Sequence, residues 1–196
     1  MEHNPYAAPA AELATDASAA STQPMFYVVS TRKAALLSVL TLNLYFVYWF
    51  YRNWSSYKAV TGEKVMPVLR AIFSIFFTHS LLRKVDEVIS ERGLQHVWNH
   101  SNLATSYVGL AIFGNMVDRM SFKEVGSPYT DVLSLLVVFA LTALIVPMQR
   151  AVNLAAGDED GSSNQQFTVA NWIWMGLGGA LWLLSLYGMY LIIIGA

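Results

Sequence analysis

Long apolar segments alternate with short polar ones from residue 31 to the end of the chain. The first apolar segment runs from Ala34 to Tyr51 without a charged residue, with Arg32 and Lys33 before it and Arg52 after it. As a helix, these residues would measure about 27 Å, close to the ~30 Å hydrocarbon core of a bilayer. The pattern therefore predicts one membrane-spanning helix within residues 32–58.

Aromatic side chains gather in the second half of this predicted helix, at Tyr45, Tyr48, Trp49, Tyr51, Trp54 and Tyr57. Trp and Tyr rings are enriched at lipid–water boundaries, so we expect these rings at the membrane surface. Before the helix, residues 26–30 are short, aromatic and β-branched. They predict an extended or interfacial segment that leads into it.

The second apolar segment, residues 71–82, is too short to cross a bilayer and indicates an interfacial or re-entrant position. It continues into an amphipathic pattern in which Leu81, Leu82, Val85, Val88 and Ile89 share one helix face. Pro67 suits the first turn of a helix, and Gly93 suits its end. We therefore predict a single helix over residues 67–92 that does not cross.

Three further apolar segments follow, at residues 103–117, 132–148 and 168–196, with a polar, acidic connection at residues 149–167. The predicted fold is thus all-α: an integral membrane bundle of four spanning helices plus one interfacial or re-entrant helix. Five spans remain the alternative. The distribution of Lys and Arg favours four spans, with the N-terminal tail outside the cytoplasm and residues 52–102 inside.

Composition agrees with a membrane protein. Hydrophobic residues make up 55% of the 196 residues and charged residues 13%, about half of the ~25% found in soluble domains. The net charge of −1 gives no indication of nucleic-acid binding, and the absence of cysteine excludes disulfides and thiolate chemistry. Residues 1–24 are rich in Ala, Ser and Pro and predict a disordered tail, and residues 25–196 predict one transmembrane helical domain.

Several short motifs resemble a group of small bacterial multi-pass membrane proteins. The resemblance rests on the YWFYRNW helix end at residues 48–54 and on Pro67 followed by RAIF at residues 70–73. The QRAVN stretch at residues 149–153, together with Phe167, Asn171 and Asn4-Pro5-Tyr6, is also similar to that group. The resemblance implies a bacterial protein of the inner membrane. It implies no activity, cofactor or partner.

Polar side chains beside or within the apolar segments are candidate sites for lipid or interhelical contacts: Arg70, His79, Asn43, Trp54 and Asn171. Arg70 precedes an apolar segment, where a guanidinium can reach lipid headgroups, serve as a buried hydrogen-bonding hub, or act in transport or catalysis. His79, Asn43 and Asn171 are expected to hydrogen-bond between helices.

No cofactor, metal or catalytic site is predicted. His96 and His100 have the i,i+4 spacing of metal ligands but no third ligand nearby, and the acidic residues 158–160 lack the glutamate that closes a calcium loop. Gly176, Gly178, Gly179 and Ala180 form a patch of small residues. This patch favours close helix packing, either within the chain or against itself or another membrane protein.

These features favour a non-enzymatic membrane protein that binds lipid or another membrane protein. A small transporter, channel or accessory subunit is one alternative. A membrane enzyme that modifies lipid is another, with Arg70, His79 and His96 as its first candidate residues.

Overall fold

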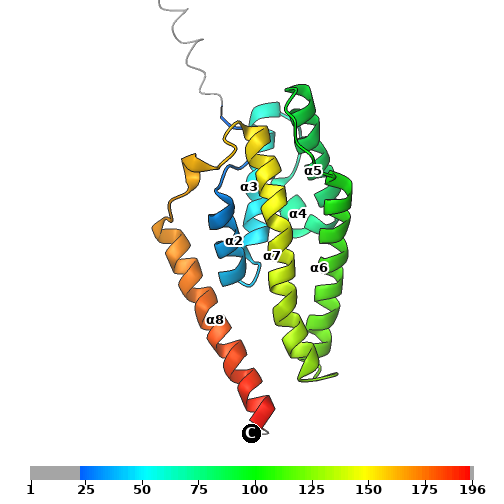
Figure 1. Cartoon of the computed structure of the whole chain (residues 1–196), viewed down its shortest axis with the longest axis vertical. Helices are drawn as coiled ribbons and strands as arrows, with labels where there is room; N and C mark the ends of the chain where they lie inside the picture. Colours follow the sequence, from blue (N-terminus) through cyan, green and yellow to red (C-terminus); the bar gives the residue numbers. More distant parts are fainter. Residues whose placement is uncertain (1–22, 195–196) are drawn as a thin grey trace, which may run out of the picture.

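The computed structural model describes residues 23–194, which form seven α-helices and contain no β-strand (Figure 1). The predicted disordered tail lies almost entirely outside this range. The helices are α2 (Thr31–Leu40), α3 (Tyr45–Thr61), α4 (Pro67–Ile72), α5 (Ser74–Glu91), α6 (His100–Phe122), α7 (Tyr129–Ala156) and α8 (Val169–Ile194), with a short 3₁₀ helix, η1 (Ser162–Asn164), before α8. The all-α prediction is confirmed.

The predicted spanning helix at residues 32–58 is wrong, because the chain reverses in its middle. Helix α2 has 10 residues, about 15 Å, and ends at Leu40. Helix α3 then returns alongside it, so that residues before α2 meet the second half of α3. The Phe26 and Tyr57 rings are stacked with centroids 6.0 Å apart, and Tyr27 N–H donates to Asn53 Oδ1 at 3.2 Å.

Residues 41–44 make this reversal possible. Leu42 and Asn43 have positive φ angles of 51° and 64°, the left-handed conformation that interrupts a helix. Thr41 Oγ1 donates to Leu37 O and accepts from Tyr45 N–H, which closes α2 and starts α3. The Asn43 amide reaches α7, where it donates to Val138 O at 3.2 Å and accepts from Thr142 Oγ1 at 3.1 Å.

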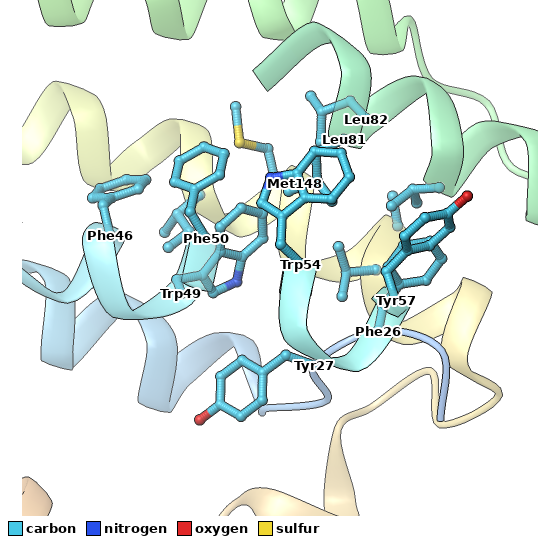
Figure 2. Packing of buried hydrophobic residues seen from close by; sticks show 14 of the residues in the cluster. Phe26, Tyr27, Phe46, Trp49, Phe50, Trp54, Tyr57, Leu81, Leu82 and Met148 are labelled. Atoms are coloured by element: carbon cyan, nitrogen blue, oxygen red, sulfur yellow. The ribbon is translucent and has the colours of Figure 1, made fainter. Parts of the chain in front are cut away.

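The aromatic side chains of α3 form the core of the protein instead of a membrane-surface belt (Figure 2). Trp49, Phe50 and Trp54 are completely buried, and Tyr45 and Tyr57 nearly so. Tyr48 and Tyr51 alone among the six predicted belt residues stay exposed, at 43% and 39%. The belt prediction is therefore wrong for Tyr45, Trp49, Trp54 and Tyr57, whose rings pack against α5 and α7.

Residues 26–29 are buried and lie outside any helix, and Ser30 has an extended backbone with φ −62° and ψ 140°. Side-chain amides of α7 and η1 bind the backbone of this segment. Asn153 on α7 binds both Val29 N–H (3.3 Å) and Val29 C=O (3.0 Å). Gln149 Nε2 donates to Tyr27 O at 3.1 Å, and Asn164 Nδ2 donates to Val28 O at 2.9 Å. An extended segment with no strand beside it needs such partners when it is buried.

Two helices replace the single helix predicted over residues 67–92. Phe73, with φ −98° and ψ 38°, separates α4 from α5. The other features of this region are confirmed. Pro67 lies in the first turn of α4, the five predicted apolar residues of α5 are buried, and Gly93 follows the end of α5 with a φ of 65°.

Helices α7 and α8 are the two described helices long and apolar enough to cross a membrane. Of their apolar stretches, 28% is buried within the protein in α7 and 6% in α8. Helix α7 extends to Ala156, so residues 149–156 are not part of a polar loop as predicted, and Pro147 lies inside the helix. Gln149 and Asn153 point into the core from this extension.

Helix α8 packs mainly on α2 and otherwise stands apart from the bundle (Figure 1). Gly178 makes this contact possible, since a Cβ there would lie 1.8 Å from Leu40 O. Trp182 Nε1 donates to Val39 O at 2.8 Å, a carbonyl in the last turn of α2 that also accepts from Leu42 N–H at 3.1 Å. Gly178 is therefore the member of the predicted small-residue patch that packs closely against another helix.

Candidate functional site

A groove of about 630 Å³ lies between the first half of α8 and the elements α2, α3 and α4. Its walls are mainly apolar and include Leu37, Leu44, Val47, Val68, Ala71 and Ile72, with Trp174 on the α8 side. Several of these side chains are exposed to the groove, among them Ile72 at 60% and Leu44 at 57%. The volume is within the range of about 300–1,000 Å³ of pockets that hold small molecules.

The polar side chains that line this groove come from more than one element: Tyr45, Tyr48 and Tyr51 on α3, Thr41 before it, and Thr168 and Asn171 on the α8 side. Tyr45 and Tyr48 line it and have the i,i+3 spacing of helix neighbours, and Arg52 follows one turn later. The Arg52 guanidinium lies over the Tyr27 ring at 4.9 Å and the Tyr48 ring at 5.8 Å, and its Nη1 donates to the Tyr48 hydroxyl at 3.0 Å. Within residues 23–194, Arg52 makes no ion pair.

Tyr27 brings a third hydroxyl to this face. Its ring meets Tyr48 edge-on at 5.8 Å, and its hydroxyl points away from the aromatic core (Figure 2). Asn164 Nδ2 donates to that hydroxyl at 3.3 Å. Lys33, which the sequence placed at the end of a membrane span, is buried here, and its Nζ donates to Asn164 Oδ1 at 2.7 Å and Gln166 O at 2.6 Å. Burial lowers the pKa of Lys33.

The Tyr45 hydroxyl is buried and makes no hydrogen bond of normal geometry within the described part of the chain, although the Tyr27 hydroxyl lies close enough to influence its pKa. Burial raises its pKa well above the ordinary value, so the group remains an O–H donor, while nearby Arg52 acts in the opposite direction. An unpaired buried hydroxyl costs about 1–3 kcal/mol. We therefore define the tyrosine–arginine cluster as Tyr27, Tyr45, Tyr48 and Arg52.

Of the residues predicted as sites from the sequence, the structure brings Arg70 and Trp54 together, while His79, Asn43 and Asn171 have other partners. The Arg70 guanidinium lies over the rings of Trp54 (4.1 Å) and Phe77 (5.1 Å), a cation–π arrangement beneath which Trp54 is fully buried. His79 Nε2 lies 3.1 Å from Thr105 Oγ1, which links α5 to α6. Asn171 exchanges hydrogen bonds with Thr168 at the start of α8, so it caps that helix and does not join two helices.

The residues considered for metal binding have structural partners. His100 Nδ1 lies 3.3 Å from Asp86 Oδ2, and Trp98 donates to the other oxygen of the same carboxylate. Asp158 accepts from Ser162 N–H and Ser163 N–H, which holds its pKa at about 2. In residues 23–194 no three His, Asp or Glu side chains lie close enough together to hold a metal ion.

Apart from Gly178, the members of the predicted small-residue patch face away from the bundle. A Cβ added at Gly176 or Gly179 would meet nothing within 4 Å, and Ala180 is exposed. A second hollow, of about 280 Å³, lies where the end of α8 approaches the α6–α7 turn, beside Ser121 and Asp131. Asp131 accepts hydrogen bonds from Ser121 and Ser127.

Comparisons with protein-family models, with curated proteins and with solved structures returned no match. The groove and the residues around it are therefore the basis for assigning a function to this protein. The resemblance to bacterial multi-pass membrane proteins stays a prediction.

The sequence missed the groove because its walls depend on the reversal at residues 41–44. A continuous helix would place Leu37 and Tyr48 about 16 Å apart along one axis, whereas the hairpin brings both to the same wall. The available signal was the i,i+3,i+7 spacing of Tyr45, Tyr48 and Arg52, which places a cation and two hydroxyls on one helix face.

Proposed function

We propose that this protein is a multi-pass bacterial inner-membrane protein that binds a lipid in the groove between α8 and the α2–α4 region, without catalysing a reaction on it. The observation that carries the proposal is the apolar groove of about 630 Å³, which is lined by a few polar side chains, among them Tyr45 and Tyr48 of α3. An apolar cavity with a few convergent polar groups is the usual form of a small-molecule site.

The proposed membrane arrangement has three crossings: α7 and α8, and also α6, which is less apolar than these two and would cross packed along α7. Helix α6 has 23 residues, about 35 Å, packs along α7 and exposes apolar side chains such as Ile112 (55%) and Met116 (55%). Exposed apolar surface of this extent favours contact with lipid over water. The α2–α3 hairpin does not cross and enters from one side only, so this proposal replaces the four-span topology.

The charge distribution supports one orientation. We define the head as residues 23–99 and 149–168. The head contains ten of the chain's twelve Lys and Arg residues, and the other two are Arg119 in the last turn of α6 and Lys123 directly after that helix. The positive-inside rule places the head on the cytoplasmic side and the end of α8 on the outer side. In this arrangement Arg32 and Lys33 join the other cations, which the four-span topology did not allow.

The groove opens between α8 and the head, so a lipid of the cytoplasmic leaflet can enter it sideways. Leu44, Val47, Val68 and Ile72 would contact an acyl chain, and Tyr51 and Asn171 provide amphipathic and polar groups on the wall. A lipid bound there would be partly withdrawn from the bilayer. Carriage, sensing or structural use of a lipid are all consistent with such a site.

Native mass spectrometry of the purified protein tests the proposal. We expect wild-type protein to retain about one lipid per chain in mild detergent, and Ile72→Trp to lose it, because the larger side chain fills the groove. Ile112→Trp is the matched control, since Ile112 is similarly exposed but lies on α6, outside the groove. Equal retention by both variants would contradict lipid binding in the groove.

A further inference from the structure

The groove's polar wall indicates which lipids it can hold. We infer that the tyrosine–arginine cluster binds the phosphate of an anionic phospholipid whose acyl chain occupies the groove. This inference depends on the proposed lipid-binding function and adds the headgroup class to it. Its support comes from the Arg52 cation beside the groove and from the buried Tyr45 hydroxyl on the groove wall.

Arg52 is the cation suited to this role. Its guanidinium is held between the Tyr27 and Tyr48 rings, and its single hydrogen bond among the described residues goes to the Tyr48 hydroxyl. A guanidinium has five N–H donors in a planar fork that matches two oxygens of a phosphate. The rings fix the plane of the guanidinium, and its remaining donors have no carboxylate to bind in residues 23–194.

Tyr45 gives independent support. Its hydroxyl is buried on a ring that lines the groove and makes no hydrogen bond of normal geometry in residues 23–194, although the Tyr27 hydroxyl is close enough to raise its pKa as a weak partner. Buried hydroxyls in folded proteins nearly always have a partner, and an exception calls for an explanation. A phosphate oxygen is an acceptor that would satisfy it while binding Arg52.

Other cations of the head are less suitable. The Lys33 ammonium already donates to Asn164 and Gln166, and the Arg70 guanidinium lies over Trp54 and Phe77. Lys84 pairs with Glu63 at 3.6 Å and Glu87 at 3.4 Å. Arg52 therefore stands out, because it combines a fixed guanidinium, a place beside the groove and the absence of a counter-ion among the described residues.

The test is a titration of delipidated protein in a nonionic detergent with two lipids of identical acyl chains: phosphatidylglycerol, and diacylglycerol, which lacks the phosphate. We expect Arg52→Gln to lower the affinity for phosphatidylglycerol about tenfold or more, as for a lost charged hydrogen bond, and to leave that for diacylglycerol within about twofold. Arg150→Gln is the matched control, because Arg150 is exposed on α7 outside the groove, and it should change neither.

Tyr45→Phe separates binding from folding. Removing an unpaired buried hydroxyl should leave the melting temperature of the lipid-free protein unchanged or raised. The same change should lower phosphatidylglycerol affinity about 2–10-fold, because one hydrogen bond to the phosphate is lost. Unchanged phosphatidylglycerol affinity in both Tyr45→Phe and Arg52→Gln would overturn the inference.

Two further arms distinguish the possible failures. If Ile72→Trp weakens both lipids but Arg52→Gln weakens them equally, a lipid binds and the phosphate assignment is wrong. If Ile72→Trp weakens neither lipid, the proposed function itself fails. Inorganic phosphate tests the source of the ligand: we expect it not to displace phosphatidylglycerol at equimolar concentration, and displacement would show a site for free phosphate instead.

Discussion

Truncation of Asn153 to alanine tests how the extended segment at residues 26–30 is held. The Asn153 side chain is completely buried on α7 and binds both backbone groups of Val29, at 3.3 Å and 3.0 Å. It also accepts from Gln149 Nε2 at 2.6 Å. Asn153→Ala therefore leaves a buried N–H and a buried C=O of the main chain without partners.

The expected cost follows from these two groups. A buried donor or acceptor that loses its partner costs about 1–3 kcal/mol, so the pair costs about 2–6 kcal/mol. Water entering the vacated space would bring the value toward the lower end. For a protein of 150–250 residues, each kcal/mol shifts the melting temperature by about 2–4 °C, so we expect a decrease on the order of 10 °C.

Thermal unfolding in detergent, followed by circular dichroism, measures this decrease. Asn115→Ala is the control, because the exposed Asn115 amide donates only to Ala111 O, one turn earlier in its own helix. We expect that substitution to change stability by less than about 0.5 kcal/mol. Equal melting temperatures for the two variants would refute the claim that Asn153 anchors residues 26–30.

The remaining predictions concern α8, the loop before it and the topology. Gly178→Leu should destabilise the α2–α8 contact, because its Cβ would overlap Leu40 O. Gly176→Leu should have little effect, because that position is open. The melting temperatures of the two variants test this difference. The pKa of Asp158 is about 2, below its ordinary 3.8, so its stabilising contribution is present above pH 3.8 and is lost as the pH falls through 2. Asp158→Ala should therefore lower the melting temperature at pH 7 more than at pH 2, and equal decreases would contradict this. Single cysteines at positions 64 and 123 should label from opposite faces of the inner membrane, the first only after the cytoplasmic side is opened; labelling from the same face would exclude the proposed three crossings.

Periodicity was sufficient for helices that bury one clear face. The stripe at Leu81, Leu82, Val85, Val88 and Ile89 correctly predicted α5, because one face is apolar and the other charged. The Arg83–Glu87 spacing likewise corresponds to an ion pair at 3.8 Å. Ends marked by Pro67 and Gly93 were also predictable, since these residues constrain the backbone directly.

Periodicity failed where a segment is apolar on every side. The hydropathy pattern of residues 34–51 is the same for one long helix as for two short ones. It therefore does not predict that the chain reverses direction. The turn at Leu42 and Asn43 contains neither glycine nor proline, and asparagine is the one residue there that tolerates a left-handed conformation well. The hydrogen bond that anchors this turn goes from Asn43 to Val138 O on α7, 95 residues away in the chain. A contact at this separation leaves no local sequence pattern.

The candidate site was missed for a related reason. Tyr45 and Tyr48 were assigned to a membrane-surface belt because aromatic residues at a helix end are typical of one. Gln149 and Asn153 were assigned to a loop because they follow an apolar segment. Both pairs, Tyr45 with Tyr48 and Gln149 with Asn153, lie beside the buried segment at residues 26–30. Tyr27 and Val29 of this segment are more than 100 residues from Gln149 and Asn153 in sequence.

The most direct test of the account asks whether one lipid occupies the groove. The chain contains no cysteine, so a single cysteine can be introduced at position 72 or 112 and labelled with a fluorophore. Delipidated protein in detergent is then titrated with a spin-labelled phosphatidylglycerol, whose nitroxide on the acyl chain quenches nearby fluorophores. We predict quenching at position 72 that saturates near one lipid per chain, and little quenching at position 112 over the same range. Equal, non-saturating quenching at both positions would contradict a specific lipid site between α8 and the head.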